Sequence, residues 1–259
     1  MKSNKLLLED LQREEYKMAG HSHWAGIKHK KGRADKERSK IFSKLSREIT
    51  VAAKLGDKDP DMNPRLRTAI QDAKQANMPK DNISRAISKS QMIDDKNYEN
   101  LRYEGFGTSN IAFIIETLTD NKNRSASSIR TVLQKNGGRL GESGSVTYMF
   151  SNCGIIQFKK NKISEEEAFD ISINAGAKDC SNLKDVFEII TKKEDFYKIK
   201  NELEKKIDTF SYSAIEWRAL NYIDLNKEQS GKILEILGAL EELDDVQNIY
   251  TNASLGNIK

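Results

Sequence analysis

The sequence predicts an α+β protein of several domains: an N-terminal three-helix bundle followed by two ferredoxin-like α/β modules, one inserted in the other. The chain has 259 residues, more than the roughly 100 to 200 residues of a typical single domain. Apolar residues recur every three or four positions in the first part of the chain, whereas short β-branched runs alternate with helical segments after Tyr98. The charge also changes between these regions, so we expect them to have different roles.

The N-terminal region begins with segments that lack apolar periodicity. Residues 1–17 are expected to be an extension, and the glycine-containing residues 18–33 (MAGHSHWAGIKHKKGR) an extended arm. From about Ala34, apolar residues at helical spacing predict a helix with one buried stripe, which ends at Gly56. The stripe consists of Ile41, Leu45, Ile49 and Ala52.

Two further helices complete the predicted bundle. Asn63 is expected to cap the second helix, with Pro64 as its first residue, and Pro79 ends it. A third short helix is expected to follow Asp81. The inward-facing residues are predicted to be Leu66, Ile70 and Ala73 in the second helix, and Ile83, Ala86 and Ile87 in the third. The arm and the bundle form one predicted domain, residues 18–97.

Strands and helices alternate in the rest of the chain. A strand over residues 111–119, a helix around residues 126–133 capped by Asn123, and a strand over residues 144–150 are predicted first. The last 40 residues or so add a strand near 221–224, a helix over 227–242 and a strand over 246–252. Residues 98–152 and 219–259 are therefore expected to form one middle α/β domain.

A second α/β module is predicted to interrupt the middle domain at residues 153–218. Its expected elements are a strand (154–160), a helix (164–175), a short strand (177–180), a strand (186–191), a helix (194–206) and a strand (211–219). This β-α-β-β-α-β order is the ferredoxin-like one. Because that fold supports many unrelated functions, it does not by itself indicate one.

The composition excludes several classes of protein. Hydrophobic residues make up 37% of the chain and charged residues 32%, and no segment approaches the roughly 18 apolar residues of a membrane span. The short apolar run that starts at Leu6 is interrupted by Glu9 and Asp10, which argues against a secretory signal and against an organellar transit peptide. Two cysteines, Cys153 and Cys180, are too few for a disulfide framework. We therefore expect a cytoplasmic protein.

The formal net charge of +4 conceals an uneven distribution. Residues 17–96 contain 19 Lys or Arg and 10 Asp or Glu, whereas residues 97–259 contain 21 and 25. The stretch from Lys28 to Lys54 alone has ten basic and three acidic residues. Such a region suits a polyanion, because neutralising phosphates releases condensed counterions. The plainer alternative is that these lysines only solvate a helix face.

Candidate binding residues follow from the spacing of the cations. On the first helix Lys40, Lys44, Arg47 and Lys54 are predicted to form a positive ridge that faces solvent, opposite the apolar stripe. The arm and the second helix extend this surface, and Arg85 and Lys89 add charge from the third helix. The predicted nucleic-acid-binding residues are Lys28, Lys30, Lys31, Arg33, Lys40, Lys44, Arg47, Lys54, Arg67 and Lys74, with Trp24 and His29 from the arm. Trp24 suits stacking on unpaired bases, although it would equally serve to pin the arm to the bundle.

The sequence contains no recognisable catalytic, metal or cofactor motif. Residues 137–145 (GGRLGESGS) lack the Gly-Lys-Ser/Thr ending of a phosphate-binding loop and are better explained as a helix end followed by a loop. The three histidines, His21, His23 and His29, have no nearby cysteine or acids at ligand-like spacing. We therefore expect a protein that is not an enzyme and that binds no metal or cofactor.

Several long segments resemble the YebC/PmpR family of probable transcriptional regulators, whose mitochondrial relatives include the translational activator of cytochrome c oxidase subunit one. The matching segments are residues 18–32, 40–56, 63–87, 103–107, 117–125, 137–150 and 240–253. They extend from Met18 almost to the end of the chain. The first 17 residues have no counterpart, and are either a genuine extension or the product of an upstream start codon. His23 stands where the family usually has lysine.

The resemblance implies three domains, one helical and two α/β, and a cytoplasmic regulator without enzymatic activity. In the favoured mechanism the helical domain binds duplex DNA near promoters, with the basic ridge on phosphates. In the alternative, the same surface binds ribosomal or messenger RNA and assists translation. The sequence offers no clear set of base-reading side chains, so strong sequence specificity is not expected. The acidic modules are candidate surfaces for protein partners, but a pure protein scaffold would leave the positive face unexplained.

Overall fold

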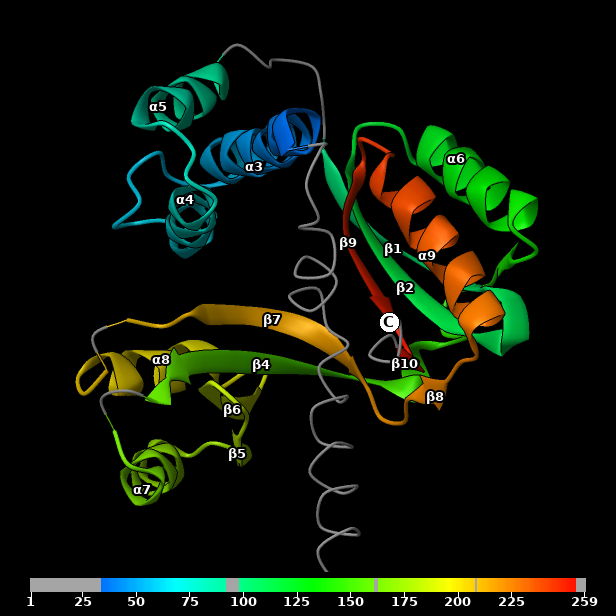
Figure 1. The fold of residues 1–259 in the computed structure, drawn as a ribbon. Coiled ribbons are helices and arrows are strands. Elements are labelled where there is room, and N and C mark those ends of the chain that lie inside the picture. Colours follow the sequence, from blue (N-terminus) through cyan, green and yellow to red (C-terminus); the bar gives the residue numbers. More distant parts are fainter. Residues whose placement is uncertain (1–33, 92–97, 161–162, 208, 255–259) are drawn as a thin grey trace, which may run out of the picture.

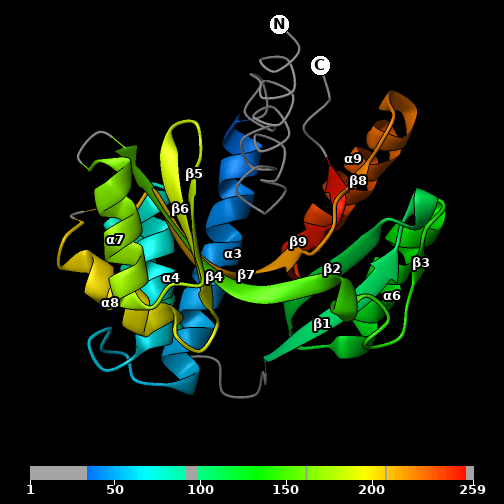
Figure 2. The same ribbon diagram turned by 90° about the horizontal axis from the view of Figure 1, so that it is seen from below.

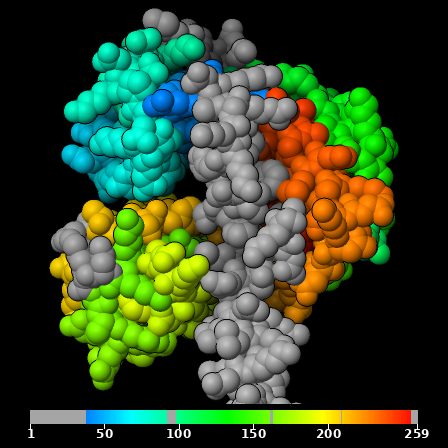
Figure 3. Space-filling view, viewed as in Figure 1, coloured from blue at the N-terminus to red at the C-terminus, as the bar shows by residue number. Residues whose placement is uncertain are grey.

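The computed structural model describes residues 34–91, 98–160, 163–207 and 209–254 (Figure 1). Helices and antiparallel sheets are both present, so the predicted α+β class is confirmed. The buried apolar residues gather in separate clusters, of which one belongs to the helical bundle and the others to the two sheets. Figure 3 shows the bundle above one α/β module and beside the other.

The bundle consists of α3 (Ala34–Leu55), α4 (Pro64–Gln75) and α5 (Lys80–Lys89). The predicted cap of α4 is confirmed: Asn63 accepts a hydrogen bond from the backbone N–H of Leu66 at 3.1 Å, and Pro64 is the first helical residue. The predicted inward residues of α4 and α5 pack in the core with Ile49 and Ala52 of α3. The predicted burial of Ile41 was wrong: 49% of its surface is exposed, and Phe42 packs against the core instead.

The middle domain is built on a four-stranded antiparallel sheet with the order β3-β1-β2-β9. Its strands are β1 (Glu99–Phe106), β2 (Ala112–Thr119), β3 (Arg139–Leu140) and β9 (Val246–Thr251). Helices α6 (Lys122–Lys135) and α9 (Lys227–Glu241) cover one face of this sheet, as Figure 2 shows. The short strands β8 (Ile223–Asp224) and β10 (Ala253–Ser254) form a separate parallel pair. A continuous apolar core joins the sheet to both helices.

The second module lies between β3 and β8 in the sequence and has its own four-stranded sheet, with the order β5-β6-β4-β7. Its elements are β4 (Phe150–Lys159), α7 (Glu165–Ala175), β5 (Asp179–Asn182), β6 (Val186–Lys192), α8 (Phe196–Glu204) and β7 (Tyr212–Ala219). The two helices cover one face, where Phe158, Phe187 and Leu203 are buried. The long strands β4 and β7 extend toward the middle domain, and Trp217 packs there against a cluster that includes Phe150 and Tyr250 (Figure 1).

Glu104 explains two errors in the sequence prediction. Residues 144–150 were expected to form a strand, but the chain turns at Gly144 and forms a short 3₁₀ helix at Thr147–Met149 before β4 begins. The buried carboxylate of Glu104 accepts hydrogen bonds from the backbone N–H groups of Gly144 (2.9 Å), Val146 (2.8 Å) and Thr147 (3.1 Å). These N–H groups are therefore not available to a strand ladder. The same buried acid interrupts the apolar pattern of β1, which the sequence did not predict.

The cap of α6 is a further correction. The helix begins at Lys122, two residues earlier than a cap at Asn123 implies, and Asn121 is its cap. Asn121 has an extended backbone, and its side-chain oxygen accepts a hydrogen bond from the N–H of Arg124 at 3.0 Å. Asn123 lies within the helix, where it cannot take this role.

Candidate nucleic-acid interface

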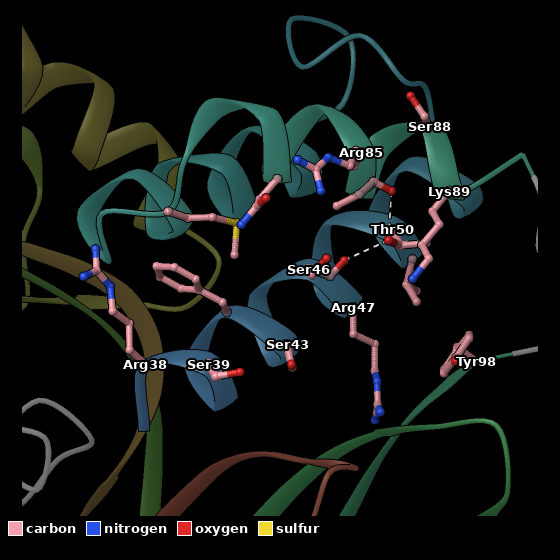
Figure 4. Close-up of a pocket in the computed structure, with 15 residues that line it drawn as sticks. Arg38, Ser39, Ser43, Ser46, Arg47, Thr50, Arg85, Ser88, Lys89 and Tyr98 are labelled. Carbon is pink, nitrogen blue, oxygen red and sulfur yellow. Dashed lines mark hydrogen bonds between the residues drawn. The ribbon is translucent and has the colours of Figure 1, made fainter. Parts of the chain in front are cut away.

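A groove of about 1090 Å³ lies between α3 and α5 and reaches Tyr98 at the start of the middle domain (Figure 4). Among the described residues, four cationic side chains line it, and no aspartate or glutamate does. The cations are Arg38 and Arg47 from α3, and Arg85 and Lys89 from α5. Hydroxyl groups add hydrogen-bonding capacity, from Ser39, Ser43, Ser46 and Ser88. We call this site the α3–α5 groove.

The packing of α5 on α3 positions the groove. Ile83 and Ala86 of α5 are buried in the bundle core, which leaves Arg85 and Lys89 on the outer side of the helix. The hydroxyl oxygen of the buried Thr50 lies 2.8 Å from the carbonyl oxygens of both Ser46 and Ala86, and so links α3 to α5 (Figure 4). This buried polar contact fixes the spacing of the two helices along the groove.

The cations of the groove differ in their surroundings. Arg85 and Lys89 have no ion pair with any residue in the described parts of the chain. The guanidinium of Arg38 lies 5.3 Å from the centre of the Phe42 ring, within the range of a cation–π contact. Arg47 extends from α3 toward the middle domain (Figure 4). At least two cations are thus available to an anion without the loss of an existing ion pair.

The predicted positive ridge does not face solvent as expected. Lys40, Lys44 and Arg47 are half-buried against the turn at residues 241–245, which joins α9 to β9 and which we call the acidic turn. Helical spacing places these cations opposite the apolar stripe, as predicted. The predicted exposure to solvent was wrong because the middle domain packs on that side of α3.

Each of these three cations donates to the middle domain. The Nζ of Lys40 pairs with the carboxylate of Glu242, and the Nζ of Lys44 donates to the carbonyl oxygen of Glu241 at 3.2 Å. The guanidinium of Arg47 donates to the carboxylate of Asp245 at 3.0 Å and to the carbonyl oxygens of Asp244 (2.8 Å) and Leu118 (3.4 Å). We call Lys40, Lys44 and Arg47 the docked cations.

Asp245 is the main hydrogen-bond acceptor of the acidic turn. Its carboxylate also accepts hydrogen bonds from Arg124 (2.8 Å), Ser125 (2.8 Å) and Thr119 (3.1 Å). Burial alone would raise the pKa of Asp245, but the hydrogen bonds from Arg124 and Ser125 outweigh it and hold the pKa below the usual value. The residue is therefore an ionised anchor at neutral pH. A second cavity of about 460 Å³ lies beside it and shares Arg47 and Tyr98 with the α3–α5 groove.

The remaining predicted residues lie elsewhere. Arg67 donates to the carbonyl oxygens of Pro60 (3.0 Å) and Asp61 (2.6 Å) in the loop before α4. Lys54 is half-buried near the end of α3, and Lys74 is exposed on α4. Of the predicted residues in the described parts, only Arg47 lines the groove. Six predicted residues, Trp24, Lys28, His29, Lys30, Lys31 and Arg33, lie outside the described residues.

The sequence prediction of the site missed Arg38, Phe42 and Tyr98, and it counted Arg85 and Lys89 only as additional charge from the third helix. One signal was present: Ser39, Ser43 and Ser46 recur at spacings of four and three, so these hydroxyl groups share a face of α3 beside Arg38. The groove itself could not be found from spacing, because it exists only where α5 packs across α3.

Two family models match the chain. The TACO1/YebC protein N-terminal domain matches residues 22–92, and the TACO1/YebC second and third domain matches residues 98–253. The chain belongs to the TACO1/YebC family. It is 55% identical over 240 residues to a protein of Pelagibacter ubique (strain HTCC1062) named as a probable transcriptional regulatory protein, covering 93% of this chain and 100% of the relative. The crystal structure of a conserved hypothetical protein from Aquifex aeolicus is similar, with a TM-score of 0.75 and 43% identity, covering 89% of this chain and 96% of that one.

The two family models match different parts of the interface. Apart from Tyr98, the lining of the α3–α5 groove falls in the segment matched by the TACO1/YebC N-terminal domain. The contacts of the docked cations join that segment to the second and third domain. In this chain, the groove thus lies almost entirely in the segment matched by one family model, whereas the docking contact joins the segments matched by two.

Both cysteines of the chain lie in its described parts. Cys153 and Cys180 are buried free thiols, and burial raises the pKa of each, which favours the unreactive protonated form. Within the described residues, no group of three His, Cys, Asp or Glu side chains could hold a metal ion. No helix among them is both long enough and apolar enough to cross a bilayer.

Proposed function

We propose that this protein is a non-enzymatic, nucleic-acid-binding regulator of gene expression, and that its α3–α5 groove binds a phosphodiester backbone. One observation carries the proposal: four cations and four serine hydroxyls line a single groove to which the described residues contribute no carboxylate. Phosphate oxygens accept hydrogen bonds from arginine, lysine and serine, and these contacts position a nucleic acid without reading its sequence. We accordingly propose binding with little sequence specificity.

The geometry of the groove suits one strand of backbone. Arg38 lies near the beginning of α3 and Arg47 lies nine positions later, a separation of roughly 13 Å at 1.5 Å per residue. Arg85 and Lys89, one helical turn apart on α5, line the opposite side. A phosphodiester chain in the groove would therefore have cations on both sides, and the rings of Phe42 and Tyr98 are the aromatic surfaces along its path.

We propose duplex DNA as the first target and transcription as the regulated process, working in the cytoplasm. The support is the printed name of the Pelagibacter ubique relative, a probable transcriptional regulatory protein. The arm residues Trp24, Lys28, His29, Lys30, Lys31 and Arg33 are proposed as additional contacts on the grounds of their charge and aromatic character. The alternative, an RNA- or ribosome-associated activator of translation, uses the same groove and is separated by experiment.

The test of the groove is a matched pair of double variants. Arg85→Ala/Lys89→Ala removes two charges from the groove, and Lys58→Ala/Lys80→Ala removes two exposed charges from the same domain outside it. We expect the groove variant to bind about 2- to 30-fold more weakly, the range for two exposed ion pairs. The salt dependence of its binding should fall by about two phosphate contacts, whereas the control should keep the wild-type slope. Equal slopes for the two variants would contradict the proposed site.

A second comparison identifies the target. Binding of the full chain to duplex DNA is measured beside single-stranded RNA and ribosomes at one physiological salt concentration. Preference for the duplex supports a role in transcription, and retention on ribosomes with negligible duplex binding supports the translational alternative. Salt-dependent binding to none of these would contradict both, and would leave a protein-interaction scaffold as the remaining class.

A further inference from the structure

The docking of the bundle on the middle domain has the composition of a protein–polyanion contact. Lys40, Lys44 and Arg47 lie at spacings of four and three on α3, which is the pattern of one helix face. The acidic turn presents to them the carboxylates of Glu242 and Asp245 and the carbonyl oxygens of residues 241 and 244. The turn also lies at the C-terminal end of α9, where the helix dipole is negative.

The same contact is built to be reversible. The side chains of Lys40 and Glu242 are 24% and 59% exposed, so water and salt screen their attraction. No apolar cluster of the described residues joins the bundle to either module. Two further contacts of the bundle are also polar: Arg65 donates to the side chain of Asn100 at 3.5 Å, and Lys200 to that of Gln71 at 3.2 Å. The Arg47–Asp245 pair is less exposed, at 28% and 12%, and is therefore the costliest part of the contact to open. A domain held by polar contacts without a shared apolar core can still separate.

The docked cations and the α3–α5 groove meet at Arg47. This residue lines the groove, yet its guanidinium is occupied by the acidic turn. A phosphate that extended along α3 from the groove would compete with Asp245 for Arg47, and then with Glu242 for Lys40. The acidic turn and a nucleic acid therefore cannot occupy this face of α3 at the same time.

We propose that the acidic turn is an autoinhibitory element, which occupies the docked cations in the closed protein and is displaced when nucleic acid binds. The inference rests on the proposed nucleic-acid binding for its ligand, although the docking itself is independent of it. In the closed state only part of the basic surface is open to a phosphate backbone. Displacement of the acidic turn adds the docked cations to that surface and separates the bundle from the middle domain.

The structural test uses charge reversal on α9 and its C-terminal cap. Glu242→Lys places a positive charge opposite Lys40, and Glu228→Lys makes the same change of charge near the start of the same helix, where Glu228 pairs only with Lys232 among the described residues. Fluorophores on Lys58→Cys and Arg130→Cys report the distance between bundle and middle domain, because the native Cys153 and Cys180 are buried. We expect a longer distance for Glu242→Lys without any ligand, and for the wild type at high salt. An unchanged distance in both conditions would overturn the reversible docking by charge, and with it the proposed displacement of the acidic turn.

The binding test uses a labelled 30-base-pair DNA duplex and a labelled single-stranded RNA of about the same length. We expect Glu242→Lys to bind about 1.4- to 5-fold more tightly than Glu228→Lys, the range for release of one exposed ion pair. Adding the oligonucleotide to the wild type should lengthen the distance between the fluorophores. Equal affinities of the two variants would overturn the competition, even if both bind. If Glu242→Lys opens the protein but no variant binds either oligonucleotide, the proposed function and the competition fall together, and docking by charge remains.

Discussion

Two faces of α3 carry arginine and lysine side chains, and they differ in what those side chains already bind. On the face toward α5, Arg38 lies over an aromatic ring, and Arg85 of α5, which lines the same groove, has no ion pair among the described residues. On the face toward the middle domain, Lys40 and Arg47 pair with carboxylates. The two faces are similar in sequence and opposite in availability. Charge density in a sequence therefore predicts where a polyanion is attracted, but not which cations are open to it.

The largest expected effect comes from removing the anchor of the docked face. Asp245→Ala removes the acceptor of Arg47, Arg124 and Ser125, and hydrogen bonds to a charged group contribute about 1.5 to 3 kcal/mol. Because Arg124 is half exposed, we expect a loss of about 2 kcal/mol in the stability of the middle domain. Hydrogen exchange of the α6 and β9 amides measures it. Asp170→Ala, an exposed aspartate on α7, is the control and should have little effect.

The same variant tests whether the two faces are independent. The bundle has its own apolar core, so its amides should keep their protection in Asp245→Ala. Loss of protection in α4 as well would show that the bundle depends on docking.

The pH dependence of stability gives a second test of Asp245. The folded-state pKa of Asp245 lies below its usual 3.8, so its contribution is present above pH 3.8 and is lost as the pH falls below that value. Asp245→Asn should remove this part of the acid sensitivity.

A smaller effect is expected at the groove itself. Thr50→Val keeps the shape of the side chain but removes the hydroxyl that contacts the carbonyl oxygens of Ser46 and Ala86. A buried hydrogen bond contributes about 1 kcal/mol, so we expect that loss of bundle stability in denaturant unfolding. Thr68→Val removes the hydroxyl of a half-buried threonine, whose exposed hydrogen bond goes to the carbonyl oxygen of Pro64 alone among the described residues, and is the matched control. Equal unfolding midpoints for the two variants would mean that Thr50 does not link α3 to α5.

The fold was more accessible to sequence analysis than the site. Apolar spacing and the Asn63–Pro64 pair predicted the helices of the bundle, because these signals are local. The strand β1 was missed because its buried acid, Glu104, is explained only by the distant N–H groups of residues 144–147. The prediction of the binding site failed for the same reason, because the site depends on contacts between distant parts of the chain. The spacing of Arg85 and Lys89 was visible, but their groove depends on packing across α3, and the pairing of Lys40 depends on a residue 202 positions away.

The smallest expected effect compares one cation of the α3–α5 groove with one docked cation. Arg85→Ala removes a groove cation that has no ion pair with the described residues, so nucleic-acid affinity should fall by about 1.4- to 5-fold and the salt slope by about one contact. Lys40→Ala removes the same charge, but its bond to Glu242 must be broken before Lys40 can contact a phosphate. The lost phosphate contact of Lys40 and the ion pair that no longer has to be broken nearly cancel, so we expect the affinity to change by less than about twofold. Titration of the labelled duplex at several salt concentrations measures both variants. If Lys40→Ala weakens binding as much as Arg85→Ala, then Lys40 is open to the ligand from the start, and the two faces of α3 are equivalent.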